Sequence, residues 1–202
     1  MLYKLQFKAL RFAYFLGMLT LLCQCKSSNL TKAQKQVADM SMLNSLMEQN
    51  AYYIDIEAVY PFATAATQRV LNSLFLSRTG NNASRIDVGG EGYFVNVRND
   101  SVKGNLSFFG ERRLSGGPYG GQNGGIEFNA IPKDYEKTIN EKKKFLEVKF
   151  TVSEKEEATE TYDVRLQIFP NHTVNVSITS TYKTFMNYKG NLNPDTNLTT
   201  LD

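Results

Sequence analysis

The residue types that most often carry catalysis are scarce in this chain of 202 residues. Its one histidine, His172, follows Pro170 and Asn171 in a run typical of a turn. Its two cysteines, Cys23 and Cys25, lie together at the end of an N-terminal apolar run. Nucleophilic catalysis needs a base beside the nucleophile, and zinc sites need histidine and cysteine ligands. We therefore expect no histidine- or cysteine-based catalysis, no metal site and no cofactor.

Acidic side chains are the remaining candidates for acid–base chemistry. Asp55 and Glu57 alternate on one face of a predicted strand, and Asp87 and Glu91 precede another. A pair of carboxylates can hydrolyse a glycosidic bond. No spacing marks one pair, however, and acids on the polar side of a half-buried strand normally form its solvent face. We expect a protein that is not an enzyme, with a glycan hydrolase as the alternative.

A glycine-rich stretch, residues 110–125, holds seven of the fourteen glycines. It lacks the Gly-Lys-Ser/Thr ending of a phosphate-binding loop and opens no helix, so nucleotide binding is not expected. Two interpretations remain, a loop that contacts a ligand and a crossing that packs tightly against the core. The ligand-contacting residues would be Tyr119, Gly120, Gly121 and Phe109.

The N-terminus has the pattern of an export signal. Lys4, Lys8 and Arg11 precede an apolar run over residues 12–22. This run is shorter than the roughly 20 residues of a membrane span. We expect residues 1–24 to be a lipoprotein-type signal peptide, with an uncleaved N-terminal anchor as the alternative.

Both cysteines lie at the end of this signal, which indicates a lipid attachment point rather than a disulfide or a metal site. Cys25 resembles the acceptor of a bacterial lipoprotein signal because Leu22 stands three residues before it. Gln24 occupies the place of the usual small residue, and Cys23 is the alternative acceptor. We expect an exported cell-envelope lipoprotein, periplasm-facing or surface-exposed, attached to the membrane through this lipid.

The charge of the chain changes when the signal is removed. The basic count falls from 23 to 20 against 20 acids, because three basic residues lie in the signal. The mature chain is formally neutral, so its composition does not favour a nucleic-acid partner.

The remaining residues predict one domain with an N-terminal helix. Residues 25–31 form a polar tether, residues 32–192 a single β domain, and residues 193–202 a polar tail. Within the domain, a helix over 32–50 carries apolar residues at three- and four-residue steps. These residues are Val37, Met40, Leu43, Leu46 and Met47.

Beyond the helix, apolar and polar residues alternate in short runs separated by turns. Residues 146–152 show the pattern most clearly, and residues 52–58, 162–168 and 174–178 repeat it. Strands without helices between them indicate an antiparallel meander. Since one face is apolar, the sheet is expected to curl into a barrel-like or two-layer arrangement. The predicted fold class is all-β with one N-terminal helix.

The order of several motifs resembles a family from Bacteroidetes known as domain of unknown function 4251. The motifs are Gly92–Val97, Asn99–Val102, Leu106–Gly110, Pro118–Gly121, Gly124–Phe128, Tyr162–Val164 and Ile168–Asn171. The resemblance covers about residues 30–192 and implies a bacterial exported or lipid-anchored single β domain. It implies a strand over residues 67–78, where the apolar spacing alone also suits a helix. It implies no known activity.

Asp100-Ser101-Val102 matches the short Asp-Ser/Thr-apolar signal that Bacteroidetes use for O-glycosylation, so Ser101 is a candidate modification site. A hairpin turn explains the same residues. Together, these patterns predict a non-catalytic lipoprotein whose β domain binds an envelope ligand or a protein partner. The alternatives are an envelope glycan hydrolase that uses a carboxylate pair and a purely structural envelope component.

Overall fold

The computed structural model describes residues 28–62, 65, 68–69, 72–73, 84–98, 100–112, 125–153 and 160–193. The chain separates into two compact units, Met1–Ser41 and Met42–Asp202. Helix α2 (Ser28–Glu48) supplies the described part of the first unit, and its last turns belong to the second. The helix begins earlier than the predicted 32–50, inside the expected tether, and ends two residues sooner.

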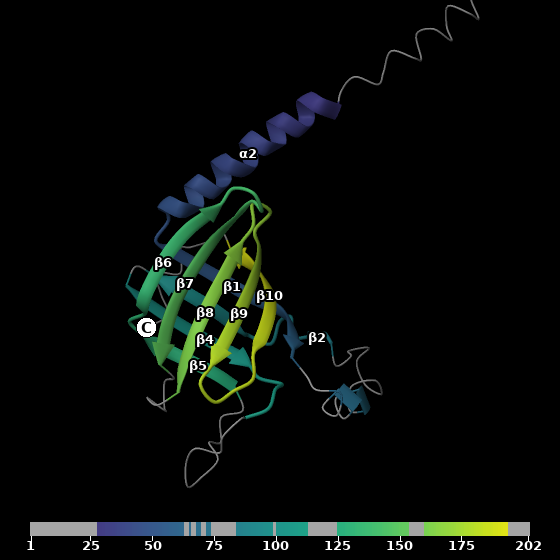
Figure 1. Ribbon diagram of the computed structural model, residues 1–202, viewed down its shortest axis with the longest axis vertical. Coiled ribbons are helices and arrows are strands. Elements are labelled where there is room, and N and C mark those ends of the chain that lie inside the picture. The colour runs from purple at the N-terminus through teal and green to yellow at the C-terminus, as the bar shows by residue number, and fades with distance from the viewer. Residues whose placement is uncertain are drawn as a thin grey trace, which may run out of the picture. The chain divides into compact units, whose positions relative to one another are not determined.

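The described residues form ten strands in one antiparallel sheet (Figure 1). The order is β5-β4-β3-β1-β10-β9-β8-β7-β6, with β2 paired to β1. The strands are β1 (Ala51–Pro61), β2 (Ile86–Asp87), β3 (Phe94–Arg98), β4 (Ser101–Ser107), β5 (Gly125–Ala130), β6 (Lys133–Asn140), β7 (Phe145–Ser153), β8 (Thr161–Ile168), β9 (Thr173–Ser180) and β10 (Met186–Asn193). This arrangement confirms the predicted all-β meander with a helix on its N-terminal side.

The segment between β1 and β3 differs from expectation in two respects. Residues 68–69 and 72–73 are helical, so the strand over 67–78 that the family resemblance implied is wrong at these positions. The three- and four-residue apolar spacing there was the better guide. The sequence pattern also missed β2, because a strand of two residues has no period to detect.

The sheet curls so that its apolar face closes on itself. In Figure 1, β6 to β9 lie in front of β4 and β5 and cross them. The ring of Phe128 on β5 reaches across the interior to Phe150 on β7, with centroids 6.2 Å apart, and to Tyr162 on β8, at 6.3 Å. Gly104 pairs with Phe128 in the ladder, and a Cβ at Gly104 would collide with the Phe128 ring. A side chain at this position would therefore displace the ring that joins the two halves of the sheet.

The C-terminal end of α2 is tied to the sheet by two side chains. The hydroxyl of Tyr52 lies 2.6 Å from the backbone oxygen of Leu46 and 2.9 Å from that of Gln49, and the two oxygens share its single proton. The Lys137 ammonium on β6 donates to the oxygens of Met47, at 2.7 Å, and Gln49, at 2.9 Å. The last carbonyls of a helix lack internal partners and favour a nearby cation. These two side chains therefore cap the helix.

The apolar stripe predicted on the helix divides between the two units. Leu43 and Leu46, in the second unit, are fully buried. Val37, in the first unit, is 71% exposed. Only the last turns of the helix therefore contribute to the core.

We expect Lys137→Met to lower the free energy of unfolding by about 1–2 kcal/mol, because two carbonyl oxygens lose a charged donor. Urea denaturation followed by circular dichroism measures this loss. Lys142→Met, at an exposed turn position between β6 and β7, is the control and should cost almost nothing. Equal stability of the two variants would show that Lys137 does not cap the helix.

Candidate functional site

The outer face of β1, β3, β4 and β5 carries a groove of about 370 Å³, here called the outer groove. Its side chains point outward because successive residues of a strand alternate between the two faces, and their inward neighbours form the core. The lining residues are Tyr53, Phe94, Asn96, Arg98, Ser101, Lys103 and Asn129.

An aromatic pair forms one part of the outer groove. The rings of Tyr53 and Phe94 stack with centroids 5.6 Å apart and an interplanar angle of 14°. They are diagonal neighbours, since Tyr53 pairs with Asn96 in the ladder and Phe94 pairs with Asp55. Burial, and then the charge of Asp55, raise the pKa of the Tyr53 hydroxyl above its ordinary value. At neutral pH a tyrosine hydroxyl is protonated, so this one is able to donate a hydrogen bond.

A row of polar side chains crosses four strands in the outer groove. Asn129 on β5 pairs with Lys103 on β4, Lys103 with Asn96 on β3, and Asn96 with Tyr53 on β1. Each asparagine amide offers both donors and acceptors of hydrogen bonds, whereas Lys103 offers only donors. The row is therefore suited to a ligand that carries many hydroxyl or carboxylate groups.

Ser101 and Arg98 lie at the end of the groove nearest the β3–β4 turn. They pair in the ladder, and the Ser101 hydroxyl donates a hydrogen bond to the Arg98 backbone oxygen at 3.2 Å. Ser101 is exposed. Its modification by a glycan stays a prediction.

The other residues expected to carry function fall in different places. Phe109 is half-buried after β4 and does not line the outer groove. Tyr119, Gly120 and Gly121, together with the candidate lipidation sites Cys23 and Cys25, lie outside the described residues. The proposal that this loop contacts a ligand therefore stays a prediction.

The acids considered for hydrolysis do not line the outer groove. Glu57 accepts a hydrogen bond from the side chain of Asn191 at 2.6 Å. Asp87 forms an ion pair with Arg85 at 3.4 Å. His172 occupies the β8–β9 turn with a φ of 65°, and its amide donates to the Phe169 oxygen at 2.9 Å.

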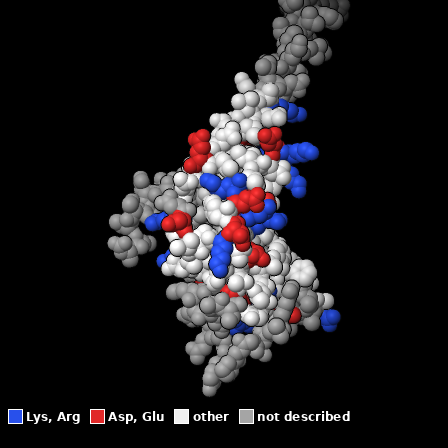
Figure 2. Space-filling model, turned by 60° about the vertical axis from the view of Figure 1, so that its left-hand side comes forward, with Lys and Arg blue, Asp and Glu red and all other residues white. Residues whose placement is uncertain are grey.

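A second groove, of about 460 Å³, lies over β6 to β9. Its lining includes acids and bases together, among them Asp163, Lys149 and Arg165. Many of these groups already have partners: Thr151 donates to Asp163 at 2.8 Å, and Glu147 pairs with Lys149 at 2.8 Å. Figure 2, which brings the side carrying β6 forward, shows acidic and basic side chains interleaved there. This mixture is typical of a solvated surface, so the outer groove is the stronger candidate site.

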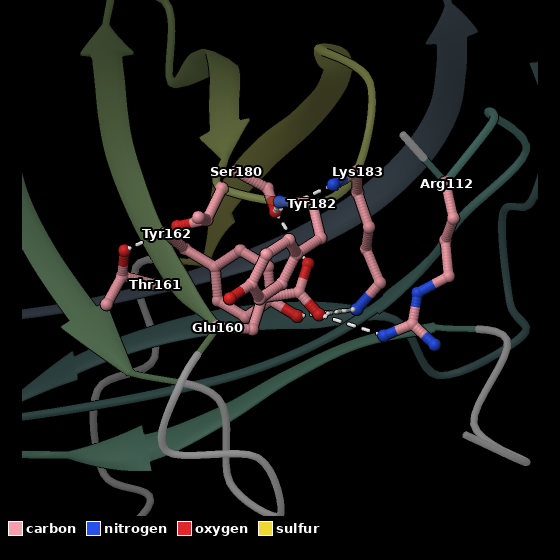
Figure 3. Close-up of polar contacts among 8 residues, drawn as sticks. Arg112, Glu160, Thr161, Tyr162, Ser180, Tyr182 and Lys183 are labelled. Carbon is pink, nitrogen blue, oxygen red and sulfur yellow. Dashed lines mark hydrogen bonds and ion pairs between the residues drawn. The ribbon is translucent and has the colours of Figure 1, made fainter. Parts of the chain in front are cut away.

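The described residues also include a buried polar cluster, here called the clasp (Figure 3). Glu160, which precedes β8, is 0% exposed, and Lys183, which precedes β10, is 2% exposed. The Lys183 ammonium donates to Glu160 at 2.9 Å and to the Tyr162 hydroxyl at 2.7 Å. Ser180 donates to Glu160 Oε1 at 2.6 Å. Arg112 donates at 3.2 Å to Glu160 Oε2, the oxygen that also accepts from Lys183.

The clasp joins three connections of the sheet. Arg112 follows β4, Glu160 lies between β7 and β8, and Lys183 lies between β9 and β10. A short backbone bridge between Arg112 and Lys183 accompanies the charged contacts. Because both oxygens of the carboxylate are occupied by protein donors and sealed from solvent, we interpret the clasp as a structural tie rather than a catalytic centre.

We expect Lys183→Met to lower the free energy of unfolding by about 3–5 kcal/mol, because it removes a buried cation from a buried carboxylate. The double variant Lys183→Met/Glu160→Leu should lose less than the single variant, since no buried carboxylate remains. Urea unfolding of the two variants and of Glu160→Leu completes the double-mutant cycle. Strictly additive losses would contradict the coupling.

Comparison with known proteins gives one match. A family model described as Domain of unknown function (DUF4251) matches residues 34–192. No curated protein and no solved structure matches the chain. Among the described residues, no helix is long and apolar enough to cross a membrane, and no three acidic, histidine or cysteine side chains gather as metal ligands.

Proposed function

We propose that this chain, which belongs to the DUF4251 family, is a lipid-anchored cell-envelope protein whose β domain binds a saccharide in the outer groove. The observation that carries the proposal is the stacked Tyr53–Phe94 pair in a groove lined with amide side chains. The groove volume, about 370 Å³, falls within the range of roughly 300–1,000 Å³ common for small-ligand sites.

A saccharide fits this lining for a chemical reason. One face of a sugar ring is formed by C–H groups, and its rim carries hydroxyls that both donate and accept hydrogen bonds. The half-buried rings of Tyr53 and Phe94 offer a large, rigid surface for the C–H face. Asn96 and Asn129 offer the mixed donors and acceptors that hydroxyls need. The groove thus combines an apolar platform with orienting polar groups.

The membrane attachment belongs to the same proposal and rests on the sequence. Cys25 follows a short apolar run and carries the lipid after removal of residues 1–24. A domain held at the membrane is present at high effective concentration near envelope ligands, which favours capture of weakly bound chains. A non-catalytic binding role agrees with the scarcity of histidine and cysteine.

We expect Phe94→Ala to weaken saccharide binding by about tenfold or more, because it removes half of the stacked pair. A glycan microarray identifies ligands of the wild-type domain, and isothermal titration calorimetry then measures the variant. Phe62→Ala is the matched control, since Phe62 is 70% exposed and does not line the groove.

Equal losses in the two variants, or the absence of any bound glycan, would contradict the binding role. Release of shortened sugar products by the wild-type domain would instead favour the alternative of an envelope glycan hydrolase. In that case, Asp55, Glu57, Asp87 and Glu91 are the acids to substitute.

We expect Cys25→Ser to abolish lipid attachment in a bacterial host that modifies lipoproteins, because the thiol is the site of acylation. Partition into detergent and intact-mass measurement detect the lipid. Cys23→Ser is the matched control and should leave the lipid in place. Loss of the lipid in Cys23→Ser alone would place the attachment at Cys23. Retention of the lipid in both variants would contradict lipidation at these cysteines.

A further inference from the structure

We infer that the outer groove binds an acidic polysaccharide, whose chain lies across the strands with its carboxylates toward Lys103 and Arg98. This inference rests on the proposed function and adds the class of the saccharide and its direction. It depends on two features of the groove, the distribution of charge and the register of the strands.

The charges of the groove are arranged in rows across the strands, with Arg98 in the row nearest the β3–β4 turn and Lys103 in the next. The lining residues include two bases, Arg98 and Lys103, and no acid. Two acids, Glu127 and Asp55, lie in the row on the other side of Lys103, away from the β3–β4 turn. Asn105 and Phe94 lie between them in that row. Their carboxylates accept hydrogen bonds from sugar hydroxyls and repel a ligand carboxylate.

This arrangement orients a charged ligand. A carboxylate on the ligand is attracted to the side that carries Lys103 and Arg98, where the hydrogen bonds formed are charge-assisted. Asp100, in the β3–β4 turn, lies past Arg98 and outside the lining. The hydroxyls of a neutral saccharide would still accept hydrogen bonds from the two bases but would lack the attraction between opposite charges, so an acidic saccharide binds more tightly.

The register of the strands indicates the direction of the chain. The row from Asn129 through Lys103 and Asn96 to Tyr53 presents one side chain from each of four adjacent strands. Neighbouring strands are about 4.8 Å apart, so the row spans roughly 14 Å. The strand spacing is close to the length of one sugar unit in an extended chain. A chain that crosses the strands therefore meets one polar side chain per sugar.

Native affinity electrophoresis tests the inference with defined polymers. The mature domain runs through gels that contain polygalacturonate or hyaluronate, or the same polymers after chemical reduction of their carboxyl groups to alcohols. Each reduced polymer keeps its backbone and hydroxyls but loses its charge. We expect at least one acidic polymer to retard the protein, and its reduced form to retard the protein at least tenfold less strongly by apparent affinity.

Variants locate the binding and its direction. We expect Lys103→Ala and Arg98→Gln each to weaken retardation by about three- to tenfold. Asn129→Ala should also weaken it if the chain extends across the strands to β5. Lys142→Ala, in the β6–β7 turn, and Asn175→Ala, on the outer face of β9, are the matched controls and should not change retardation.

Several outcomes would overturn the inference. Equal retardation by acidic and reduced polymers, still dependent on Phe94, would leave the saccharide-binding function standing and remove the preference for acid. Equal losses of retardation in Lys103→Ala and Lys142→Ala would show unspecific attraction of a polyanion. Unchanged retardation of Asn129→Ala would contradict the direction of the chain across the strands. Binding of a single-stranded oligonucleotide through the same residues would replace the saccharide as ligand. No retardation by any polymer would count against the proposed function itself.

Discussion

The structure depends on one constraint, which is that a sheet with a single apolar face must bury that face against itself. The only cysteines, Cys23 and Cys25, precede the β domain, so no disulfide supports it. The helix contributes only its last turns to the core. The sheet therefore curls until β5 faces β7 and β8, and Phe128 fills the space between them. Burial of this kind is the main favourable term in folding.

Curling a sheet leaves polar backbone and charged groups at the two ends of the curl. Near the start of β1, Tyr52 and Lys137 satisfy the carbonyl oxygens at the end of α2. β1 ends at Pro61, which pairs with Met186, and Lys183 of the clasp lies just before that pairing. At each end of the curl, hydrogen bonds from buried or half-buried side chains therefore satisfy these polar groups. The strands between the two ends form a regular outer face.

The sequence pattern predicted the strands well because their physical signal is local. Alternation over residues 146–152 marks β7, and the run over 162–168 marks β8, with bounds that agree within a residue or two. The predicted helix was displaced to Ser28–Glu48, since the polar residues at its start carry no apolar period. The two-residue strand β2 was not predicted. The strand implied over 67–78 is wrong where the chain is described, because the spacing of the apolar residues there also suits a helix.

The candidate site was hidden for a different reason. Tyr53, Phe94, Asn96 and Lys103 occupy outward positions that a sequence pattern assigns only to solvent. Their proximity depends on the pairing of β1 with β3 across more than thirty intervening residues, which no local pattern reports. The signal that a reader could have used is chemical: Tyr53 and Phe94 are large apolar residues on the face that alternation assigns to water, and such residues need a neighbour or a ligand.

The packing of the interior agrees with a binding surface proposed on the outside of the domain. Four aromatic residues are fully buried and serve as core rather than as the lining of a cavity: Tyr52, Tyr162, Tyr188 and Phe128. The Tyr188 hydroxyl donates to the Ser107 oxygen at 2.9 Å, and burial raises the pKa of Tyr188 well above its ordinary value. Among the described residues, aromatic, amide and cationic side chains line the outer groove together, and the proposed site therefore lies on the outer face.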